Sequence, residues 1–134
     1  MIDIENEVYT RVRNAVLAYN NAIKITGAEL AKATSFPTVV FTQQDSSTYT
    51  QTSDSGSLEN HASFLFQIDV YDNDQSKRKT NCKKIMGIID EEMLAMGFTR
   101  KSLSPTPNLQ DMSIYRLTAR YTGVADKKHF IYRG

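Results

Sequence analysis

The amino-acid sequence predicts an α+β domain in which two helices cover one face of a mainly antiparallel sheet of four or five strands, with a projecting polar loop or hairpin. Apolar residues recur at helical spacing in residues 1–20 and 76–96, and at alternate positions in residues 62–71 and 114–121. Helical and strand patterns therefore alternate along 134 residues, the length of one ordinary domain. We expect a single domain over residues 1–134.

The N-terminal part of the chain is predicted to hold one long helix and one short element. The helix has a single apolar stripe, while Glu5 and Arg11 lie elsewhere around its circumference. The stripe consists of Ile4, Val8, Val12, Ala15, Val16 and Tyr19. Asn20 and Asn21 favour an end to this helix, and residues 22–36 fit either a brief strand or a second short helix.

A short strand and a polar arm follow. Pro37 suits the start of a strand because it needs no ladder N–H, and residues 38–42 are rich in β-branched and aromatic side chains. Residues 43–60 have almost no large aliphatic side chains, so they can contribute little to a core. The β-prone stretch around Tyr49 predicts a projecting arm that gains its partner only when copies of the protein assemble.

The clearest strand leads directly into the clearest helix. In residues 62–71 alternate apolar side chains predict one face in the core. These side chains are Phe64, Phe66, Ile68 and Val70. In residues 76–96 an apolar stripe predicts a helix, with Gly97 placed to cap its C-terminus and Phe98 placed to fold back onto its end. This stripe consists of Cys82, Ile85, Ile88, Ile89, Met93 and Met96.

Between that strand and that helix lies the cluster Asp72, Asn73 and Asp74. It resembles the start of a calcium loop, but such a loop places its ligands at alternate positions and needs a mid-loop glycine and a distal glutamate. Here the cluster is followed by QSKRK. Asp and Asn side chains also accept hydrogen bonds from the free N–H groups at the start of a helix. We therefore predict a turn and not a metal site.

The C-terminal third is predicted to contain two more strands. Residues 101–111, KSLSPTPNLQD, form a proline-interrupted crossover into a second alternating strand. One face of this strand consists of Tyr115, Leu117, Ala119 and Tyr121. Arg116 and Arg120 lie on the other face, where pairing with the preceding strand would bring either arginine to Asp69. After a turn at ADKK, residues 129–133 form a last strand.

The composition argues against several kinds of chemistry. Sixteen cationic and fifteen acidic residues give a net charge of +1, so no global field favours nucleic acid or an anionic membrane. Cys82 is the single cysteine and lies on an apolar stripe, and His61 and His129 lack a nearby nucleophile or second ligand. No phosphate-binding loop is present. We expect no catalytic residue, no cofactor and no metal, and a protein that is not an enzyme.

Local features of the sequence leave two alternative functions open and indicate where the protein is made. The cations of residues 77–79 favour a nucleic-acid-binding module as one rival, and scattered acids leave an enzyme as another. The first residues are charged, and no apolar stretch has the length of a membrane span. We therefore expect a soluble protein made inside the cell, with no membrane partner.

The charges of the helix predicted over residues 76–96 run against its dipole, which favours acids at the start and cations at the end. The cations lie in its first half and the acids in its second half. A solvated face accounts for this arrangement, and the alternative is that the cations meet the acidic end of a neighbouring copy. The candidate subunit-interface residues are Lys77, Arg78, Lys79, Asp90, Glu91, Arg116, Arg120 and Tyr49.

Three segments occur in the order ENHASFLFQIDVYDND, CKKIMGIIDEEMLAMGFTR and SPTPNLQDMSIYRLTARYTG. Together they resemble the small minor structural proteins of tailed bacteriophages and of phage-derived tail particles of Gram-positive hosts, similar to the tail terminator and tail-to-head joining family. The resemblance covers residues 35–125 and rests on the order of the elements together with these phrases.

The resemblance implies a subunit that assembles as a ring, expected to be hexameric, on the end of a completed tail tube. Such a ring stops tube growth and provides the docking surface for the neck or head. Its main partners would be copies of itself and the tail tube protein. Sheath, neck or connector proteins are further candidates, and DNA would only pass through as cargo. A head-completion or neck adaptor protein is the alternative.

The same resemblance has consequences for location and for contact surfaces. It implies a protein made in the cytoplasm of a bacterial host that becomes part of a virion or phage-tail-like particle. It also assigns the arm over residues 43–60 and the face that carries Arg116 and Arg120 to contacts with neighbouring subunits.

Overall fold

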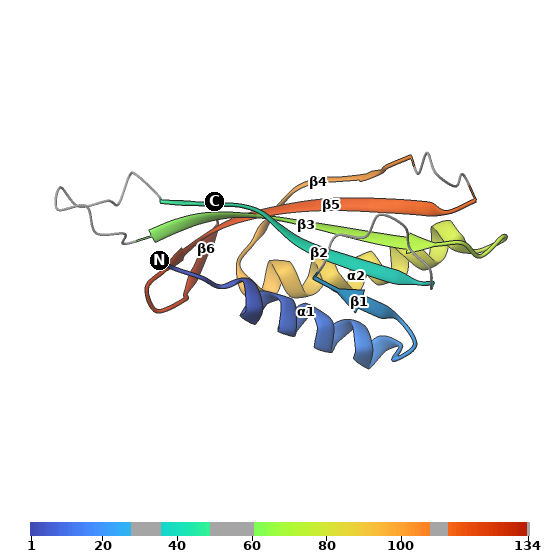
Figure 1. Cartoon of the computed structure of the whole chain (residues 1–134), viewed down its shortest axis with the longest axis horizontal. Helices are drawn as coiled ribbons and strands as arrows, with labels where there is room; N and C mark the ends of the chain where they lie inside the picture. The colour runs from blue at the N-terminus through green and yellow to red at the C-terminus, as the bar shows by residue number, and fades with distance from the viewer. Residues whose placement is uncertain (28–35, 49–60, 108–112, 134) are drawn as a thin grey trace.

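The computed structural model describes residues 1–27, 36–48, 61–107 and 113–133, and within them it has the predicted α+β architecture (Figure 1). The elements are α1 Glu5–Tyr19, β1 Lys24–Thr26, β2 Thr38–Thr48, β3 His61–Asp72, α2 Arg78–Met96, β4 Thr99–Pro105, β5 Tyr115–Asp126 and β6 Ile131–Arg133. The fold class is therefore confirmed, with a sheet of six strands in place of the four or five predicted.

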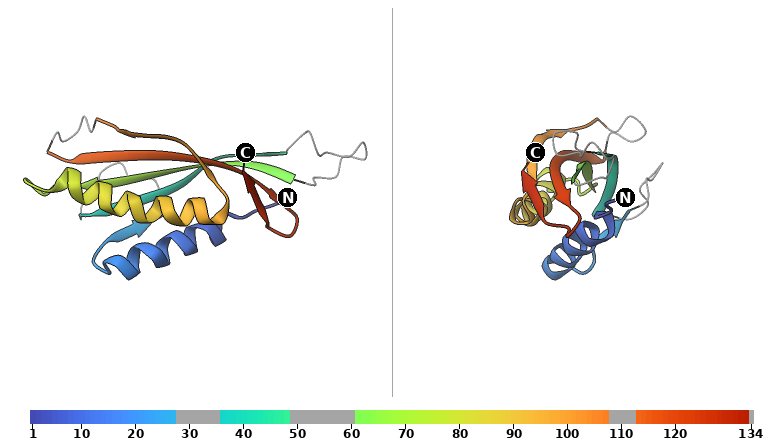
Figure 2. Two further views of the ribbon diagram at one scale, coloured as in Figure 1. Left: turned by 180° about the vertical axis from the view of Figure 1, so that it is seen from behind. Right: turned by 90° about the vertical axis from the view of Figure 1, so that its left-hand side faces the viewer.

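The strands form one sheet in the order β1-β2-β3-β5-β4, with β6 paired to β5 as well. β4 pairs with residues 117–122 of β5 and β6 pairs with residues 123–125, so these two strands share one edge of β5. Every pair is antiparallel except β1 with β2. Both helices lie on one face of the sheet, and the β2–β3 hairpin extends past them at one end of an elongated molecule (Figures 1 and 2).

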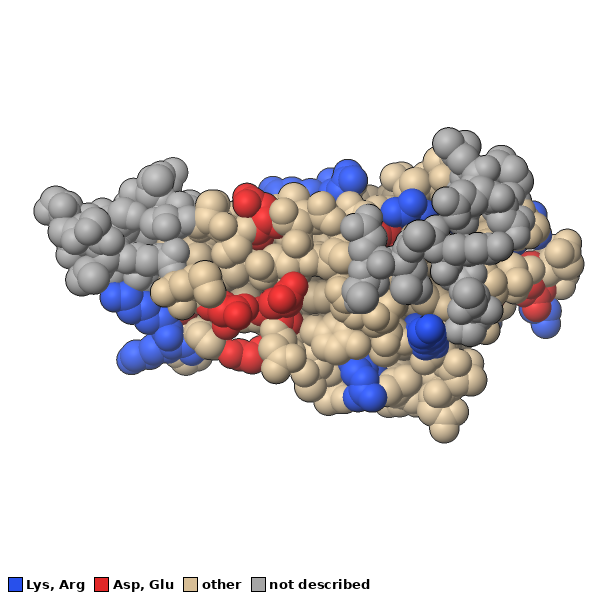
Figure 3. All heavy atoms as spheres, in the orientation of Figure 1, with Lys and Arg blue, Asp and Glu red and all other residues tan. Residues whose placement is uncertain are grey.

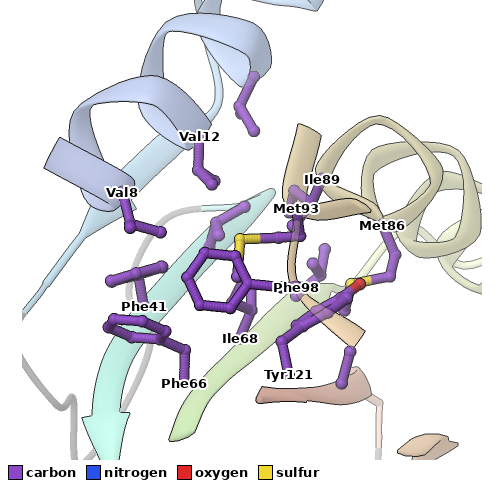
Figure 4. Packing of buried hydrophobic residues seen from close by; sticks show 14 of the residues in the cluster. Val8, Val12, Phe41, Phe66, Ile68, Met86, Ile89, Met93, Phe98 and Tyr121 are labelled. Atoms are coloured by element: carbon purple, nitrogen blue, oxygen red, sulfur yellow. The ribbon is translucent and has the colours of Figure 1, made fainter. Parts of the chain in front are cut away.

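The core fills the space between the two helices and the helix-facing side of β2, β3 and β5 (Figure 4). The alternation predicted for β3 is confirmed, because each of its predicted core residues is at most 1% exposed. Phe66 lies with its ring centroid 5.1 Å from that of Phe41 and 5.5 Å from that of Phe98. Buried aromatic rings remove large apolar areas from water, so this cluster contributes strongly to folding.

Most of the stripe predicted for α1 is buried. Its buried residues are Val8, Val12 and Val16. Ile4, directly before the helix, is 1% exposed, and Ala15 is half-buried. The prediction that Tyr19 lies in the stripe is wrong, since Tyr19 is 50% exposed. The reason is its position as the last helical residue, after which Asn20 takes an extended conformation.

The predicted end of α2 at Gly97 is confirmed. Gly97 has a φ of 109°, in the left-handed region, and its N–H donates to the carbonyl of Leu94. The N–H of Phe98 donates to the carbonyl of Met93 at 3.0 Å, which turns Phe98 back into the core, where it has no exposed surface. The buried residues of α2 are Cys82, Ile85, Met86, Ile89 and Met93.

Strand β4 contradicts the crossover predicted for residues 101–111. It is an edge strand whose side chains are mostly exposed, so it carries no alternating apolar pattern that could be detected in the sequence. Its position comes from backbone pairing with β5, with an irregularity between Arg100 and Ser102. Residues 108–112 of the predicted crossover lie outside the described residues.

The N-terminal strands differ from the prediction in extent. β2 runs beyond residues 38–42 to Thr48, because its backbone continues to pair with β3 through polar sequence. The base of the predicted arm is therefore half of a β-hairpin, while residues 49–60, Tyr49 included, lie outside the described residues. Of the two alternatives for residues 22–36, the described part contains the brief strand β1.

Candidate subunit interface

The face of the sheet opposite the helices carries a connected set of polar side chains. Because side chains alternate along β3 and β5, residues that follow core positions in both strands meet on this face. The predicted cross-strand contact is confirmed, since Nε of Arg116 donates to Oδ1 of Asp69 at 3.0 Å. We call this surface the polar face, and its residues are Gln67, Asp69, Arg116, Thr118 and Arg120.

Asp69 is the centre of the polar face. It is 3% exposed although neither α1 nor α2 packs on this side, and a buried carboxylate is unfavourable unless hydrogen-bond donors surround it. Besides Arg116, the hydroxyl of Thr118 donates to Oδ1 at 2.5 Å and Nε2 of Gln67 donates to Oδ2 at 3.0 Å. The hydroxyl of Thr118 also shares a 2.7 Å hydrogen bond with that of Thr106. The carboxylate is thus compensated by three side chains from two strands.

The two arginines predicted at the interface are both held by cross-strand contacts. The guanidinium of Arg116 also lies over the ring of Tyr71, 5.4 Å from its centroid. Nε of Arg120 donates to Oε1 of Gln67 at 3.0 Å, and Arg120 itself is exposed. A small depression of about 80 Å³ beside Asp69 is lined in part by Arg116 and Tyr71. Both arginines therefore lie on one ordered surface, as predicted.

The cluster at residues 72–74 forms the predicted turn. Oδ1 of Asp74 accepts the backbone N–H groups of Ser76 at 3.0 Å and Lys77 at 2.9 Å, at the start of α2. These hydrogen bonds lower the pKa of Asp74 below its ordinary value, and the one from Ser76 has the largest effect. Asp72 accepts a hydrogen bond of 2.8 Å from the side-chain amide of Asn81. Within the described ranges, no group of three or more His, Cys, Asp or Glu is arranged to hold a metal ion.

The basic half of α2 faces solvent. Lys77 and Lys79 are exposed, and so are Lys83 and Lys84 one turn further along the helix. Arg78 is half-buried, and its Nη1 donates to the carbonyl of Gln75 at 3.1 Å. The predicted cationic surface is thus present at the start of the helix.

The acidic half of α2 is largely engaged within the chain. Oδ1 of Asp90 accepts a 2.8 Å hydrogen bond from the hydroxyl of Tyr121 and forms an ion pair of 3.3 Å with Arg100. Burial, together with this hydrogen bond, raises the pKa of Tyr121. Glu92 pairs with Arg11 of α1 at 3.0 Å, whereas Glu91 is exposed. Of the two acids predicted for the interface, only Glu91 therefore faces outward.

A groove between α2 and the edge strand β4 is a feature that the sequence did not predict. Its volume is about 400 Å³. Apolar side chains, those of Met86, Leu103 and Leu117, line its interior. The cationic side chains of Lys79, Lys83 and Arg100 also line it, together with Asp90, which pairs with Arg100. Because β4 was predicted to be a crossover, no sequence signal placed these residues together; we call this feature the basic groove.

Cys82, His61 and His129 are candidate reactive side chains in the sequence. Cys82 is buried, as predicted from its stripe, and its thiol donates to the carbonyl of Val70 at 3.5 Å. Burial raises the pKa of this thiol to about 12, so it is protonated at neutral pH. His61 begins β3 with its ring centroid 5.9 Å from that of Tyr132, and Nδ1 of His129 contacts Oε1 of Glu7.

Comparison with protein-family models and with curated proteins finds no match for this chain. What the described residues define is an α+β domain with a polar sheet face and a basic groove. In these residues no helix combines the length and the apolar content needed to span a membrane.

Proposed function

We propose that this chain is a structural subunit of a phage or phage-like tail, forming a ring that caps the tail tube, ends its growth and provides the docking surface for the neck or head. The resemblance of the three quoted segments supports this proposal. Its expected partners are further copies of the chain, in a hexameric ring, and the tail tube protein.

The polar face is the observation that carries the proposal. A ring subunit needs an ordered surface, separate from its own core, that a neighbour can contact. Neither helix packs on the polar face, and hydrogen bonds within β3 and between β3 and β5 already fix Gln67, Asp69 and Arg116. Because these side chains are ordered before any partner arrives, binding there would lose little conformational entropy.

The β2–β3 hairpin gives further support. It extends past the helices at one end of the molecule (Figure 1). The exposed side chains of its β2 half, from Gln44 to Ser47, are all polar or charged, so this segment has little core of its own to fill. A projecting hairpin of this kind can reach a neighbouring subunit or ring, which agrees with the assembly proposed here.

Removing the protein from the phage or tail particle that encodes it tests the function directly. Overlong tail tubes seen by electron microscopy are the expected result, since tubes would polymerise past their normal end. Tails of normal length that fail to join heads would instead assign the chain to the alternative, a head-completion or neck adaptor. Normal particles in the absence of the protein would contradict both.

Reversal of the cations at the start of α2 tests the assembly of the ring. We expect the variant Lys77→Glu, Arg78→Glu and Lys79→Glu to form less stable rings, because the cations would no longer meet an acidic neighbour. Native mass spectrometry of the purified variant measures the oligomer. A ring as stable as that of the wild type would remove these residues from the interface.

The exposed lysines of α2 also favour one rival, a nucleic-acid-binding module. The net charge of +1 argues against it, because such binding generally uses a broad basic surface. Titration of the purified protein with duplex DNA at several salt concentrations separates the two. Tight binding that weakens steeply with salt would favour the rival function.

A further inference from the structure

The basic groove has a chemical character that points to a particular occupant. Lys79 and Lys83 lie one helical turn apart on α2, whereas Arg100 on β4 is paired with Asp90, which also lines the groove. Apolar side chains lie beside the two lysines, and Leu103 on the β4 side of the groove is 41% exposed. A partner that fits must bring negative charge together with some apolar contact.

Gly87 leaves room for a partner within this groove. It lies in the interior of α2, where glycine is a poorer helix former than alanine, and its backbone has no conformation that requires glycine. A Cβ atom built at this position would have no atom within 4 Å outside its own helix. The groove is therefore open at a position where alanine would favour the helix, as expected if another chain approaches α2 closely.

A surface of opposite charge lies at the start of α1. Asp3, Glu5 and Glu7 are all exposed, and we call them the acidic surface. Oε1 of Glu7 contacts Nδ1 of His129, so the negative charge offered to a partner comes from Asp3 and Glu5. Figure 3 shows acidic side chains gathered over this part of the molecule. Glu5 also borders a shallow hollow of about 190 Å³, lined by Tyr9 and Phe41 among others, so negative charge lies beside partly apolar surface here as well.

The acidic surface and the basic groove lie on different sides of the molecule. The end-on view in Figure 2 places α2 and β4 on one side, and β2 on the other with α1 below. The acidic surface begins α1, whose Tyr9 packs against Phe41 of β2, at the side away from β4. In a closed head-to-tail ring every subunit uses two different surfaces, one toward each neighbour. Opposite charges on separate sides suit that geometry, and a net charge of +1 is consistent with it.

We propose that the basic groove of one subunit receives the acidic surface of the next copy in the ring. This inference rests on the proposed function, and it names the contact that joins the subunits. It replaces the acidic end of α2 as the partner of the cations, because Asp90 and Glu92 of that end are engaged with Arg100 and Arg11. Lys79 belongs both to the candidate interface predicted from the sequence and to the groove.

Charge reversal on each side provides the test, with the oligomer followed by native mass spectrometry and sedimentation. Lys79→Glu with Lys83→Glu makes the groove acidic, and Asp3→Lys with Glu5→Lys makes the acidic surface basic. Each double variant is expected to raise the concentration needed for assembly by at least about tenfold, because like charges then face each other. The groove variant should fold normally, since both lysines are exposed and acids near the start of α2 suit its dipole.

Combining the two charge reversals tests whether assembly is restored, which separates the proposed contact from any general effect of charge. A mixture of the two double variants should assemble, because each supplies the surface that the other needs, and a chain with all four substitutions should assemble alone. Gly87→Gln, which fills the groove, should abolish the ring without lowering monomer stability, while Gly87→Ala, which adds a single methyl group, should weaken the ring less than Gly87→Gln.

The outcomes distinguish this contact from the proposed function. If the wild-type chain forms a ring, and the variants with a reversed groove or with Gly87→Gln form an equally stable ring, the proposed contact is overturned. The proposed function would still stand. The contact would also be overturned if reversal of the acidic surface had no effect, since the groove would then receive another occupant. A wild-type chain that stays monomeric at every concentration would contradict the ring, and the contact with it.

Discussion

Along β3, Phe66 and Ile68 have no exposed surface on the helix side, while Gln67 and Asp69 on the other side take part in hydrogen bonds between strands. The core-facing side is held by nonspecific burial of apolar area, which tolerates many side chains of suitable size. The polar face is held by directional contacts, in which each donor has one acceptor at a defined position. One strand thus supplies stability on one side and an ordered surface on the other.

The largest expected effect lies on the core-facing side. Phe66→Ala should lower the free energy of unfolding by about 3–5 kcal/mol, because it leaves a cavity between Phe41 and Phe98. Urea denaturation measures the loss. Leu65→Ala, a half-buried neighbour on the opposite side of the strand, is the matched control and should cost much less. Equal losses at the two positions would remove the contrast between the faces.

The next effect lies on the polar face. Asp69→Ala should lower the free energy of unfolding by about 2–3 kcal/mol, because Arg116, Thr118 and Gln67 lose their shared acceptor. A double-mutant cycle with Arg116→Ala, followed in urea, isolates the ion pair from the rest of the network. A negligible cost for Asp69→Ala would mean that the polar face adds nothing to the stability of the single chain.

The turn after α2, which brings Phe98 to the core-facing side, is expected to have an intermediate effect. Gly97→Ala should cost about 1–2 kcal/mol for its left-handed backbone, and the added Cβ would meet the carbonyl oxygen of Ile131 at 2.8 Å. Gly87→Ala is the matched control and should instead stabilise the chain by about 0.5–1 kcal/mol. Thermal unfolding of both variants checks the opposite signs.

The smallest effect concerns the turn that ends β3, and it depends on pH. Since the pKa of Asp74 in the folded chain lies below its ordinary value of 3.8, its stabilisation is present above pH 3.8 and is lost as the pH falls through the folded pKa. Asp74→Ala should therefore destabilise the chain at pH 7 and have a smaller effect below pH 3. Urea unfolding at pH 7 and below pH 3 measures the loss of unfolding free energy, with Asn73→Ala as control. A loss that is the same at both pH values would contradict the role of the Asp74 carboxylate in the turn.

The predictions from sequence were correct for contacts between residues close together in the chain. They were also correct for a contact between two strands whose apolar residues alternate clearly. The spacing of Phe64 to Val70 gave the buried side of β3, Gly97 gave the end of α2, and the phase of two strands gave the contact of Asp69 with Arg116. Each of these depends on backbone geometry that the local sequence specifies.

The failures have a common physical cause. β4 and the far end of β2 are strands because their backbones pair with β5 and β3, although their side chains have no apolar alternation. Backbone hydrogen bonds do not depend on side-chain type, so such strands leave little trace in the sequence. Likewise, nothing in the local sequence showed that Asp90 would be engaged by Tyr121 and Arg100.

By itself the sequence determined the α+β class, both helices, the core-facing side of the sheet and the turn at Asp74, because periodicity and capping are local properties. Only the tertiary structure decided which charges remain available to a partner. Residues distant in sequence meet in the fold, so Asp90 becomes engaged with Arg100, while Lys79 and Lys83 of α2 come to share a groove with Leu103 of β4.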